Sequence, residues 1–203
     1  MGLLDSLREL LGTRAETDAS RAADPDDLFQ LSTAYVTMAT ELDFDPGGEA
    51  ALCFASVDST DFADTLRDVE DILATAEAET DTTARFHDDD HGYSWVVFAD
   101  DDFEDLVTSL HFAADTLIER GYGNRLLAAV FGFERDRDAT RAYWLYSFRR
   151  GSYYPFAPSG DRERSSRLEF KFESVLDGEL DVEGDKEYWY PLWPSAAGRH
   201  PWQ

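Results

Sequence analysis

The 203-residue sequence is poor in several residue types and patterns, and each shortage excludes a class of protein. It contains one cysteine, Cys53, so we expect neither an intrachain disulfide nor a zinc site built from cysteines. Because no run of about 18 apolar residues is present, the sequence predicts no transmembrane helix. The start lacks the cationic leader and long apolar stretch of a secretory signal. We therefore expect a cytoplasmic protein.

Basic residues are also scarce. The chain has 18 lysines and arginines against 43 aspartates and glutamates, a formal net charge of −25, and its only lysines are Lys171 and Lys186. Such a negative chain lacks the cations needed to bind phosphates over a broad surface, so nucleic acid is not an expected partner. The balance instead favours adaptation to high salt, where a Debye length of about 3 Å screens the repulsion among carboxylates. We interpret the source as a halophile.

What the sequence does contain is enough to build a core, since 43% of its residues are hydrophobic and 14% are aromatic. The length suits one domain, which we place at residues 26–203 with an aromatic C-terminal tail. Residues 13–25 carry almost no large apolar side chain and are interpreted as an acidic flexible linker. Residues 1–12 have the pattern of an amphipathic leader helix, with leucines at helical spacing: Leu3, Leu4, Leu7, Leu10 and Leu11.

Three roles are open for this leader helix. It could lie at a membrane surface with its leucines in the lipid boundary, dock on a helix of a partner, or pack on its own domain. On its polar face Asp5 and Glu9 oppose Arg8, so anionic lipid offers little attraction. Peripheral contact with a membrane is therefore one alternative among three.

Hydrophobic periodicity predicts the order of helices and strands. From Ala50 onward that order is strand, helix, strand, strand, helix, strand, strand, and the first six elements match a ferredoxin-like unit. We therefore expect an α+β fold with an antiparallel-rich sheet, one extra strand and flanking helices. The expected helices are 26–41, 60–78 and 102–120, and the expected strands are 50–57, 85–87, 93–99, 125–134 and 142–148.

The segments after this order are less regular. Residues 151–160, GSYYPFAPSG, are broken by prolines and predict an aromatic loop. Residues 164–176 fit either a helix or a strand, and Leu168, Phe172 and Val175 favour the helix. The last segment, EYWYPLWP, is aromatic, so we expect it to dock on the body of the domain.

Catalytic motifs are not recognisable. The sequence lacks GxSxG, GxxxxGKS/T, GxGxxG and HExxH, so we assign no catalytic residues and no cofactor, and we favour a binding role over an enzymatic one. His87 and His91 stand four residues apart, a spacing that presents two zinc ligands on a helix. Gly92 and the three aspartates between the histidines favour a turn instead. We interpret this segment as a solvated acidic hairpin without a metal ion.

The most informative feature is a local reversal of charge. Residues 135–171 contain nine basic and five acidic residues, so this segment carries +4 while the rest of the chain carries −29. Guanidinium groups pair with carboxylate or phosphate and stack on aromatic rings, so the segment predicts recognition of an acidic partner or an anionic ligand. Alternatively, the arginines neutralise the protein's own acids and the aromatic side chains pack in the core. The candidate binding residues are Arg149, Arg150, Tyr153, Tyr154, Phe156, Arg162, Arg164 and Arg167.

Several blocks of the sequence resemble one family, the PspA-associated protein PspAB, over most of the chain. The two most specific blocks come last, because their pattern of aromatic residues and prolines is unlikely to arise by chance. The blocks are MGLLDSLRELLG at the start, LFQL at 28–31, ALCF at 51–54, GYSWVV at 92–97, DLVTSLH at 105–111, GYG at 121–123, RGSYYPFAP at 150–158 and WYPLW at 189–193.

The resemblance implies an interaction partner rather than a reaction. The family is named for association with PspA, a coiled-coil protein of the phage-shock response that acts at the inner face of the membrane, and it offers no catalytic residues to transfer. We therefore expect a haloarchaeal, non-enzymatic adaptor of an envelope-stress system that binds a PspA-like partner through its Arg/aromatic segment. The alternative is binding of a small anionic ligand, such as a phosphorylated metabolite or nucleotide, or an enzymatic use of the same loop.

Overall fold

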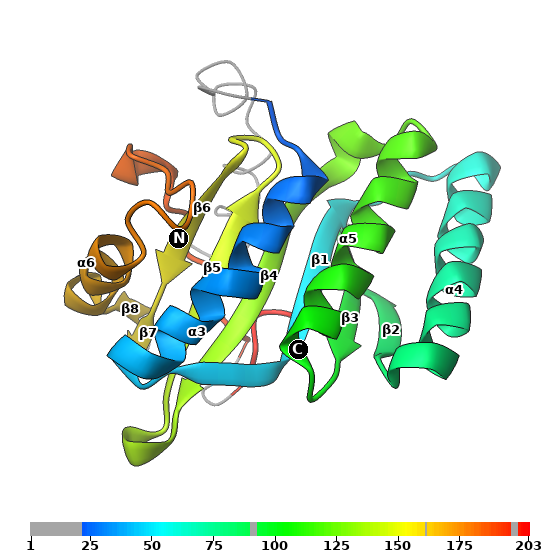
Figure 1. Ribbon diagram of the computed structural model, residues 1–203. Helices are drawn as coiled ribbons and strands as arrows, with labels where there is room; N and C mark the ends of the chain where they lie inside the picture. Colours follow the sequence, from blue (N-terminus) through cyan, green and yellow to red (C-terminus); the bar gives the residue numbers. More distant parts are fainter. Residues whose placement is uncertain (1–21, 90–92, 161, 196–198) are drawn as a thin grey trace.

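The computed structural model describes residues 22–89, 93–160, 162–195 and 199–203 (Figure 1). Its centre is a sheet of six strands in the order β2-β3-β1-β4-β5-β6, and every neighbouring pair is antiparallel. The strands are β1 (Asp45–Ala55), β2 (Thr83–Asp88), β3 (Tyr93–Ala99), β4 (Leu126–Arg135), β5 (Thr140–Ser147) and β6 (Ser152–Phe156).

The first four strands confirm the expected ferredoxin-like arrangement within an α+β fold. Strand β1 is central, with β3 and β4 on its two sides and β2 beyond β3, while one helix follows β1 and another joins β3 to β4. Strand β5 is the extra strand expected beyond β4. Because both faces of the sheet are covered, its central strands are apolar at consecutive positions, and residues 50–54 of β1 are all buried.

Three helices cover one face of the sheet (Figure 1). The segment predicted as one helix at 26–41 begins as a 3-10 turn, η1, before it continues as an α-helix. The elements of this layer are η1 (Pro25–Gln30), α3 (Leu31–Leu42), α4 (Thr60–Thr80) and α5 (Phe103–Glu119).

Helix α5 shows why the predicted boundaries were reliable. The Asp102 carboxylate caps its start by accepting the N–H groups of Glu104 and Asp105, at 2.9 and 3.4 Å. The acids of this first turn also complement the helix dipole. The chain leaves the helix at Gly121, whose φ of 83° suits glycine. Both ends of α5 are therefore encoded by local residues.

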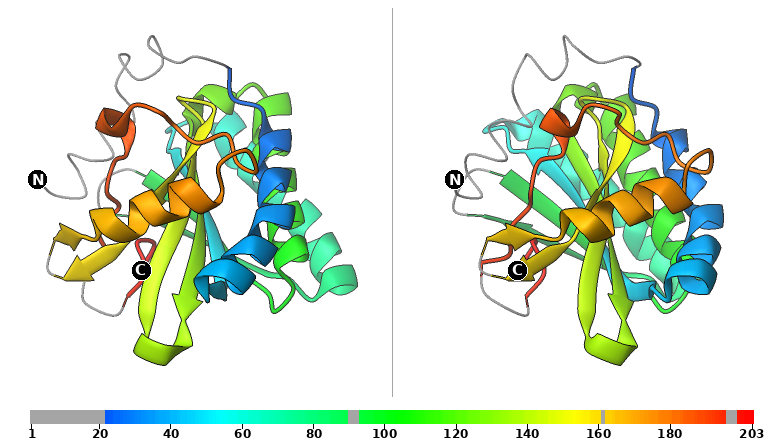
Figure 2. Two further views of the ribbon diagram at one scale, coloured as in Figure 1. Left: turned by 60° about the vertical axis from the view of Figure 1, so that its left-hand side comes forward. Right: turned by 90° about the vertical axis from the view of Figure 1, so that its left-hand side faces the viewer.

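The pleat of the strands divides the core into two layers. Leu52 points toward the helices, whereas its neighbour Cys53 points to the opposite face. That face is covered by the C-terminal segment, whose Trp189, Leu192 and Trp202 pack in the second layer. Figure 2 shows this segment, coloured orange to red, on the side of the sheet away from α3 and α5. The aromatic tail thus docks on the sheet itself.

The prediction of a loop at 151–160 is wrong for residues 152–156, which form β6 at the edge of the sheet, and for the short strand β7 (Pro158–Gly160). Pro155 has no backbone N–H to donate, and a strand at the edge tolerates this because one of its sides has no neighbouring strand. The turn before β6 contains Gly151 at φ 62°, where a Cβ would lie 2.8 Å from the Ala22 carbonyl oxygen. The aromatic residues of this segment are therefore core side chains.

Residues 164–176, which fitted both a helix and a strand, form the helix α6 (Ser166–Val175). Phe172 lies in the core layer beneath the other helices, whereas Phe170 is 52% exposed. A small ribbon of two strands precedes this helix, formed by β7 (Pro158–Gly160) and β8 (Glu163–Arg164).

The predictions for the leader helix at residues 1–12, with its five leucines, lie outside the described residues, as do those for most of the linker at 13–25. Among the helices that the structure does describe, none is long and apolar enough to cross a membrane.

Candidate functional site

The structure separates the eight predicted binding residues into a buried group and a more exposed group. Arg150 follows β5 in the turn that leads to β6, where its Nε donates to Glu183 Oε2 at 2.7 Å. Its guanidinium carbon lies 3.9 Å from the centre of the Tyr188 ring. This arginine therefore neutralises one of the protein's own acids. The buried group comprises Arg150, Tyr153, Tyr154 and Phe156.

The buried aromatic residues of β6 join the sheet to the segments that cross it. The Tyr153 hydroxyl donates toward the carbonyl oxygens of Asp27 and Leu28, at 3.1 and 3.2 Å. Burial raises the pKa of this hydroxyl, so it stays protonated at neutral pH. Tyr154 and Phe156 lie in the second core layer with the C-terminal tail. None of these three rings is presented to a partner.

Two further predicted residues are tied to neighbouring segments. Arg149 Nη2 donates to the Asn124 carbonyl oxygen at 2.8 Å. Arg164 Nε donates to both carboxylate oxygens of Glu169 at 2.9 Å, and its Nη1 donates to the Trp189 carbonyl oxygen at 2.7 Å. Arg164, like Arg150, thus pairs with one of the protein's own acids, whereas the contact of Arg149 is to a backbone carbonyl oxygen.

The remaining two predicted residues, Arg162 and Arg167, line a cleft of about 1420 Å³ where β4 turns into β5. Its walls are the β4–β5 hairpin, the β7–β8 ribbon, one face of α6 and the C-terminal segment. We call it the basic cleft, because its described lining carries a formal charge of +4. The charged residues are Arg135, Arg141, Arg162, Arg167, Lys171 and Arg199 against Glu134 and Asp138.

Two cations of the basic cleft are held by its own acids. Arg135 Nε and Nη2 donate to the Asp138 carboxylate at 3.0 and 2.7 Å. Hydrogen bonds from Arg135 and Thr140 lower the pKa of this carboxyl. Arg141 Nε donates to Glu134 at 2.7 Å. These arginines shape the hairpin wall, and their charge is largely compensated.

The opposite walls carry uncompensated charge. The side chains of Arg167, Lys171 and Arg199 make no hydrogen bond or ion pair within the part of the chain that the structure describes. Arg167, Phe170 and Lys171 stand at positions i, i+3 and i+4 of α6, so they share one face of this helix. Exposed Phe170 and half-buried Trp193 add apolar surface beside the cations.

This arrangement favours an anion in physical terms. Like charges that line a concave surface repel one another, and a bound carboxylate or phosphate relieves that repulsion. An arginine can bind such a group through two parallel N–H donors, and a lysine binds it as a point charge. In a chain of net charge −25, the reversed charge of the basic cleft therefore makes it the candidate binding site.

Sequence reasoning named Arg162 and Arg167, which line the basic cleft, but it did not separate them from the buried and paired residues of the same segment. The charge count over 135–171 includes Arg135, Arg141 and Lys171, yet composition cannot separate an exposed cation from a buried one. Arg199 lies outside that segment, and none of its neighbours in the sequence marks it as a binding residue. It reaches the cleft because of the path that the C-terminal tail takes. Composition alone draws attention to Lys171, because the chain contains two lysines in all.

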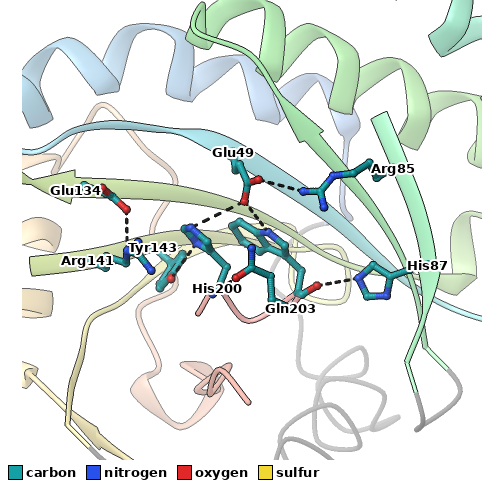
Figure 3. A network of polar contacts seen from close by, with 9 residues as sticks. Glu49, Arg85, His87, Glu134, Arg141, Tyr143, His200 and Gln203 are labelled. Carbon is teal, nitrogen blue, oxygen red and sulfur yellow. Dashed lines mark hydrogen bonds and ion pairs between the residues drawn. The ribbon is translucent and has the colours of Figure 1, made fainter. Parts of the chain in front are cut away.

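A polar network joins side chains of the sheet to the last residues of the chain (Figure 3). Glu49 on β1 accepts a hydrogen bond from Arg85 Nη2 at 3.0 Å and another from Trp202 Nε1 at 3.1 Å. The Tyr143 hydroxyl oxygen lies 3.2 Å from His200 Nδ1. Because Tyr143 also lines the cleft, the network and the cleft share a wall.

His87, considered above as a metal ligand, belongs to this network. Its Nε2 donates to the Trp202 carbonyl oxygen at 2.8 Å, so it holds the tail. His91 lies outside the described residues. Among the residues that are described, no three His, Cys, Asp or Glu side chains are grouped so that they could hold a metal ion.

Comparison with sequence models of protein families shows the relationship of the chain. The model described as PspA associated protein B matches residues 1–202. The chain belongs to the PspAB family. All described residues of the basic cleft fall within the matched range, so the cleft lies in the part of the chain that matches the PspAB family. Comparisons with curated proteins and with solved structures give no significant match.

Proposed function

We propose that this PspAB-family protein is an adaptor of a PspA-type envelope-stress system, and that it binds an acidic segment of a PspA-like coiled-coil partner in the basic cleft. The family description supports the association with PspA. The observation that carries the site is the group of uncompensated cations, Arg167, Lys171 and Arg199, on a concave surface of an acidic chain. This charge arrangement supports binding rather than catalysis.

The dimensions of the basic cleft support a polypeptide ligand. At about 1420 Å³ it exceeds the roughly 300–1,000 Å³ of pockets that enclose small molecules. Arg167 and Lys171 lie about one helical turn apart, which matches carboxylates at positions i and i+4 of a partner helix. Phe170 beside them offers an apolar contact. An acidic, amphipathic helix of a coiled-coil partner combines these features.

We place the complex in the cytoplasm at the inner face of the membrane, where PspA-type proteins act. Residues 3–11 are proposed as a separate contact, either with the membrane surface or with a partner helix. Flotation with liposomes, using the full chain and a variant that lacks residues 3–11, is the measurement for this contact; equal flotation would exclude the membrane alternative.

Reversal of charge in the basic cleft tests the proposed partner site. Arg167→Glu combined with Lys171→Glu replaces attraction by repulsion toward an acidic segment. We expect the affinity of the full-length protein for its PspA-like partner to fall at least about tenfold, which corresponds to about 1.4 kcal/mol. Titration calorimetry at one fixed salt concentration measures this, because salt screens exposed charges.

A matched control applies the same change of net charge elsewhere. Arg67→Glu combined with Arg125→Glu alters exposed residues that do not line the basic cleft. We expect this variant to bind the partner as the wild type does. If both double variants bind as tightly as the wild type, the cleft is not the partner site.

Binding of a small anionic ligand is the second candidate function, and the convergence of three uncompensated cations in a concave site favours it. A thermal-shift screen with inorganic phosphate, nucleotides and phosphorylated metabolites separates the two. A ligand at a hundredfold excess over its dissociation constant stabilises the fold by about 2.7 kcal/mol. Stabilisation that charge reversal abolishes favours the small ligand, whereas a flat screen alongside partner binding favours the adaptor.

A further inference from the structure

The C-terminal wall of the basic cleft is a segment held at both of its ends. Its described residues form no helix or strand of their own. Leu192 is fully buried just before this wall, and Trp202 is buried just after it. The position of the wall therefore depends on these two anchors. The cleft residues that the wall contributes are Trp193, Pro194, Ser195 and Arg199.

The second anchor consists of polar and stacking contacts (Figure 3). The rings of His200 and Trp202 stack with their centres 4.6 Å apart and their planes 8° apart. His200 Nδ1 lies 3.2 Å from the Tyr143 hydroxyl oxygen, and Trp202 Nε1 donates to Glu49 Oε2 at 3.1 Å. The same carboxylate oxygen of Glu49 lies 3.9 Å from His200 Nε2.

Further hydrogen bonds link this anchor to the wall. Ser195 Oγ, which lines the cleft, donates to the Gln203 carbonyl oxygen at 2.7 Å. The backbone N–H of Gln203 donates to the His200 carbonyl oxygen at 3.1 Å. Arg199 is adjacent to His200 in the chain. The last residues therefore fix both the Ser195 side and the Arg199 side of the wall.

The protonation of the anchor follows from its surroundings. Burial raises the pKa of Tyr143, so its hydroxyl stays protonated and is able either to donate to His200 Nδ1 or to accept from it. The Glu49 carboxylate lies near Nε2 and favours the proton of the neutral imidazole on that nitrogen, so that Nδ1 accepts from the Tyr143 hydroxyl. Burial, helped by Arg141, lowers the pKa of His200 against the opposing effect of Glu49 and Glu134. At neutral pH the docked tail therefore contains an uncharged His200.

We propose that Glu49, Tyr143 and His200 are positioning residues of the basic cleft: they hold its C-terminal wall, and with it Arg199, in the geometry that binds an acidic segment. This inference rests on the proposed function. Docking of the tail and binding in the cleft are then coupled in both directions. A change that releases the last residues weakens binding, and an occupied cleft strengthens docking.

Protonation of His200 is the change that releases the tail. A charged imidazole takes the Nδ1 acceptor away from the Tyr143 hydroxyl and places a second cation near Arg141. The charged and titratable groups around His200 are Glu49 from β1, Arg85 and His87 from β2, Glu134 from β4, and Arg141 and Tyr143 from β5.

The direction of the pH dependence follows from the docked state. Docking lowers the pKa of His200 below its ordinary value of 6.5, so the released tail takes up the proton more readily than the docked tail does. Docking is therefore fully favoured above that value and weakens as the pH falls below it. The loss is at most about tenfold per pH unit, because one proton is involved.

The experiment uses two readouts of the full-length protein at one fixed salt concentration, between about pH 7.5 and about pH 5.5. One is the affinity for a fluorescein-labelled hexaglutamate peptide, and the other is amide hydrogen exchange of residues 199–203. Both the affinity and the exchange protection of the wild type should fall with pH. His200→Asn keeps an acceptor at the position of Nδ1 and does not titrate, so both readouts should be independent of pH. Tyr143→Phe should lower both throughout.

The outcomes separate this proposal from the one on which it rests. Equal pH profiles for the wild type and His200→Asn would overturn it, because titration of the peptide itself is common to both proteins. Tail protection that changes while the affinity for hexaglutamate does not would also overturn it. Failure of hexaglutamate to bind any variant, together with a pH-dependent tail in the wild type alone, would contradict the proposed function and confirm the docking role of His200.

Discussion

The pair of Arg150 and Glu183 shows how much the structure depends on single side chains. The two groups meet at 2.7 Å with their side chains 6% and 7% exposed. Burial raises the pKa of Glu183, but the hydrogen bond from Arg150, with further ones from the Asp185 N–H and Ser152 Oγ, outweighs it and leaves the pKa below its ordinary value. The pair links the turn before β6 to the segment that leads into the tail.

Removal of this cation is predicted to destabilise the fold strongly. Arg150→Met leaves Glu183 buried without its ion partner, and we expect the free energy of unfolding to fall by about 3–5 kcal/mol. Because the folded pKa of Glu183 is lowered, the stabilisation is present at neutral pH and is lost as the pH falls through that folded pKa. Urea denaturation at fixed salt, at neutral and at acidic pH, measures both effects.

Arg137→Met provides the matched control for this prediction. Arg137 lies 3.4 Å from Asp43, and the two side chains are 64% and 63% exposed, so the pair is screened by water. Its loss should cost about 1 kcal/mol or less. Comparable losses in the two variants would show that the Arg150 pair contributes no more than a surface contact.

At the scale of elements, the described part of the C-terminal tail has no long helix or strand and yet packs on one face of the sheet. A helix satisfies its backbone groups internally and a strand does so through its neighbours, whereas this tail is fixed by side chains that enter the second core layer. Leu192 is fully buried there, and the Trp189 indole N–H donates to the Glu183 carbonyl oxygen at 2.9 Å. The tail is consequently part of the core.

Truncation of one tail residue should therefore destabilise the whole protein. We expect Leu192→Ala to lower the free energy of unfolding by about 2–5 kcal/mol, the range for a large-to-small change in a core. Ile72→Ala on α4 is the control, because Ile72 is 42% exposed and should lose about 1 kcal/mol or less. Chemical denaturation followed by circular dichroism measures both. A loss for Leu192→Ala no larger than the control would mean that the tail docks independently of the core.

Strand β6 and helix α6 were not determined by the local sequence patterns of their own segments. Pro155 and Gly151 are local signals of a loop, but the edge position removes the penalty of the proline and the turn uses the glycine. In residues 164–176 the helical and alternating patterns overlap, and packing of Phe172 against the helical layer accompanies the helix. Neither outcome is contained in the segment itself.

At the scale of the whole molecule, the net charge of −25 and the basic cleft respond to salt in opposite directions. Salt screens the repulsion among surface carboxylates, so we expect the thermal midpoint of unfolding to rise between about 0.2 M and 2 M KCl. Salt also screens the attraction between the cleft and an acidic ligand, so the affinity for hexaglutamate should fall over the same range. Full stability in dilute buffer would contradict the hypothesis of adaptation to high salt.

The sequence by itself determined the order of the helices and strands between residues 26 and 148, because caps, turns and hydrophobic periods act over a few residues. It also determined that the charge reverses within residues 135–171. Only the tertiary structure decided which arginines are exposed, because Arg150 and Glu183 lie 33 positions apart and burial is not a local property. The basic cleft was likewise decided by the tertiary structure, because α6, the β4–β5 hairpin and the tail bring Arg135, Lys171 and Arg199 to one surface. The tail reaches this surface because it crosses the sheet to bury its aromatic side chains.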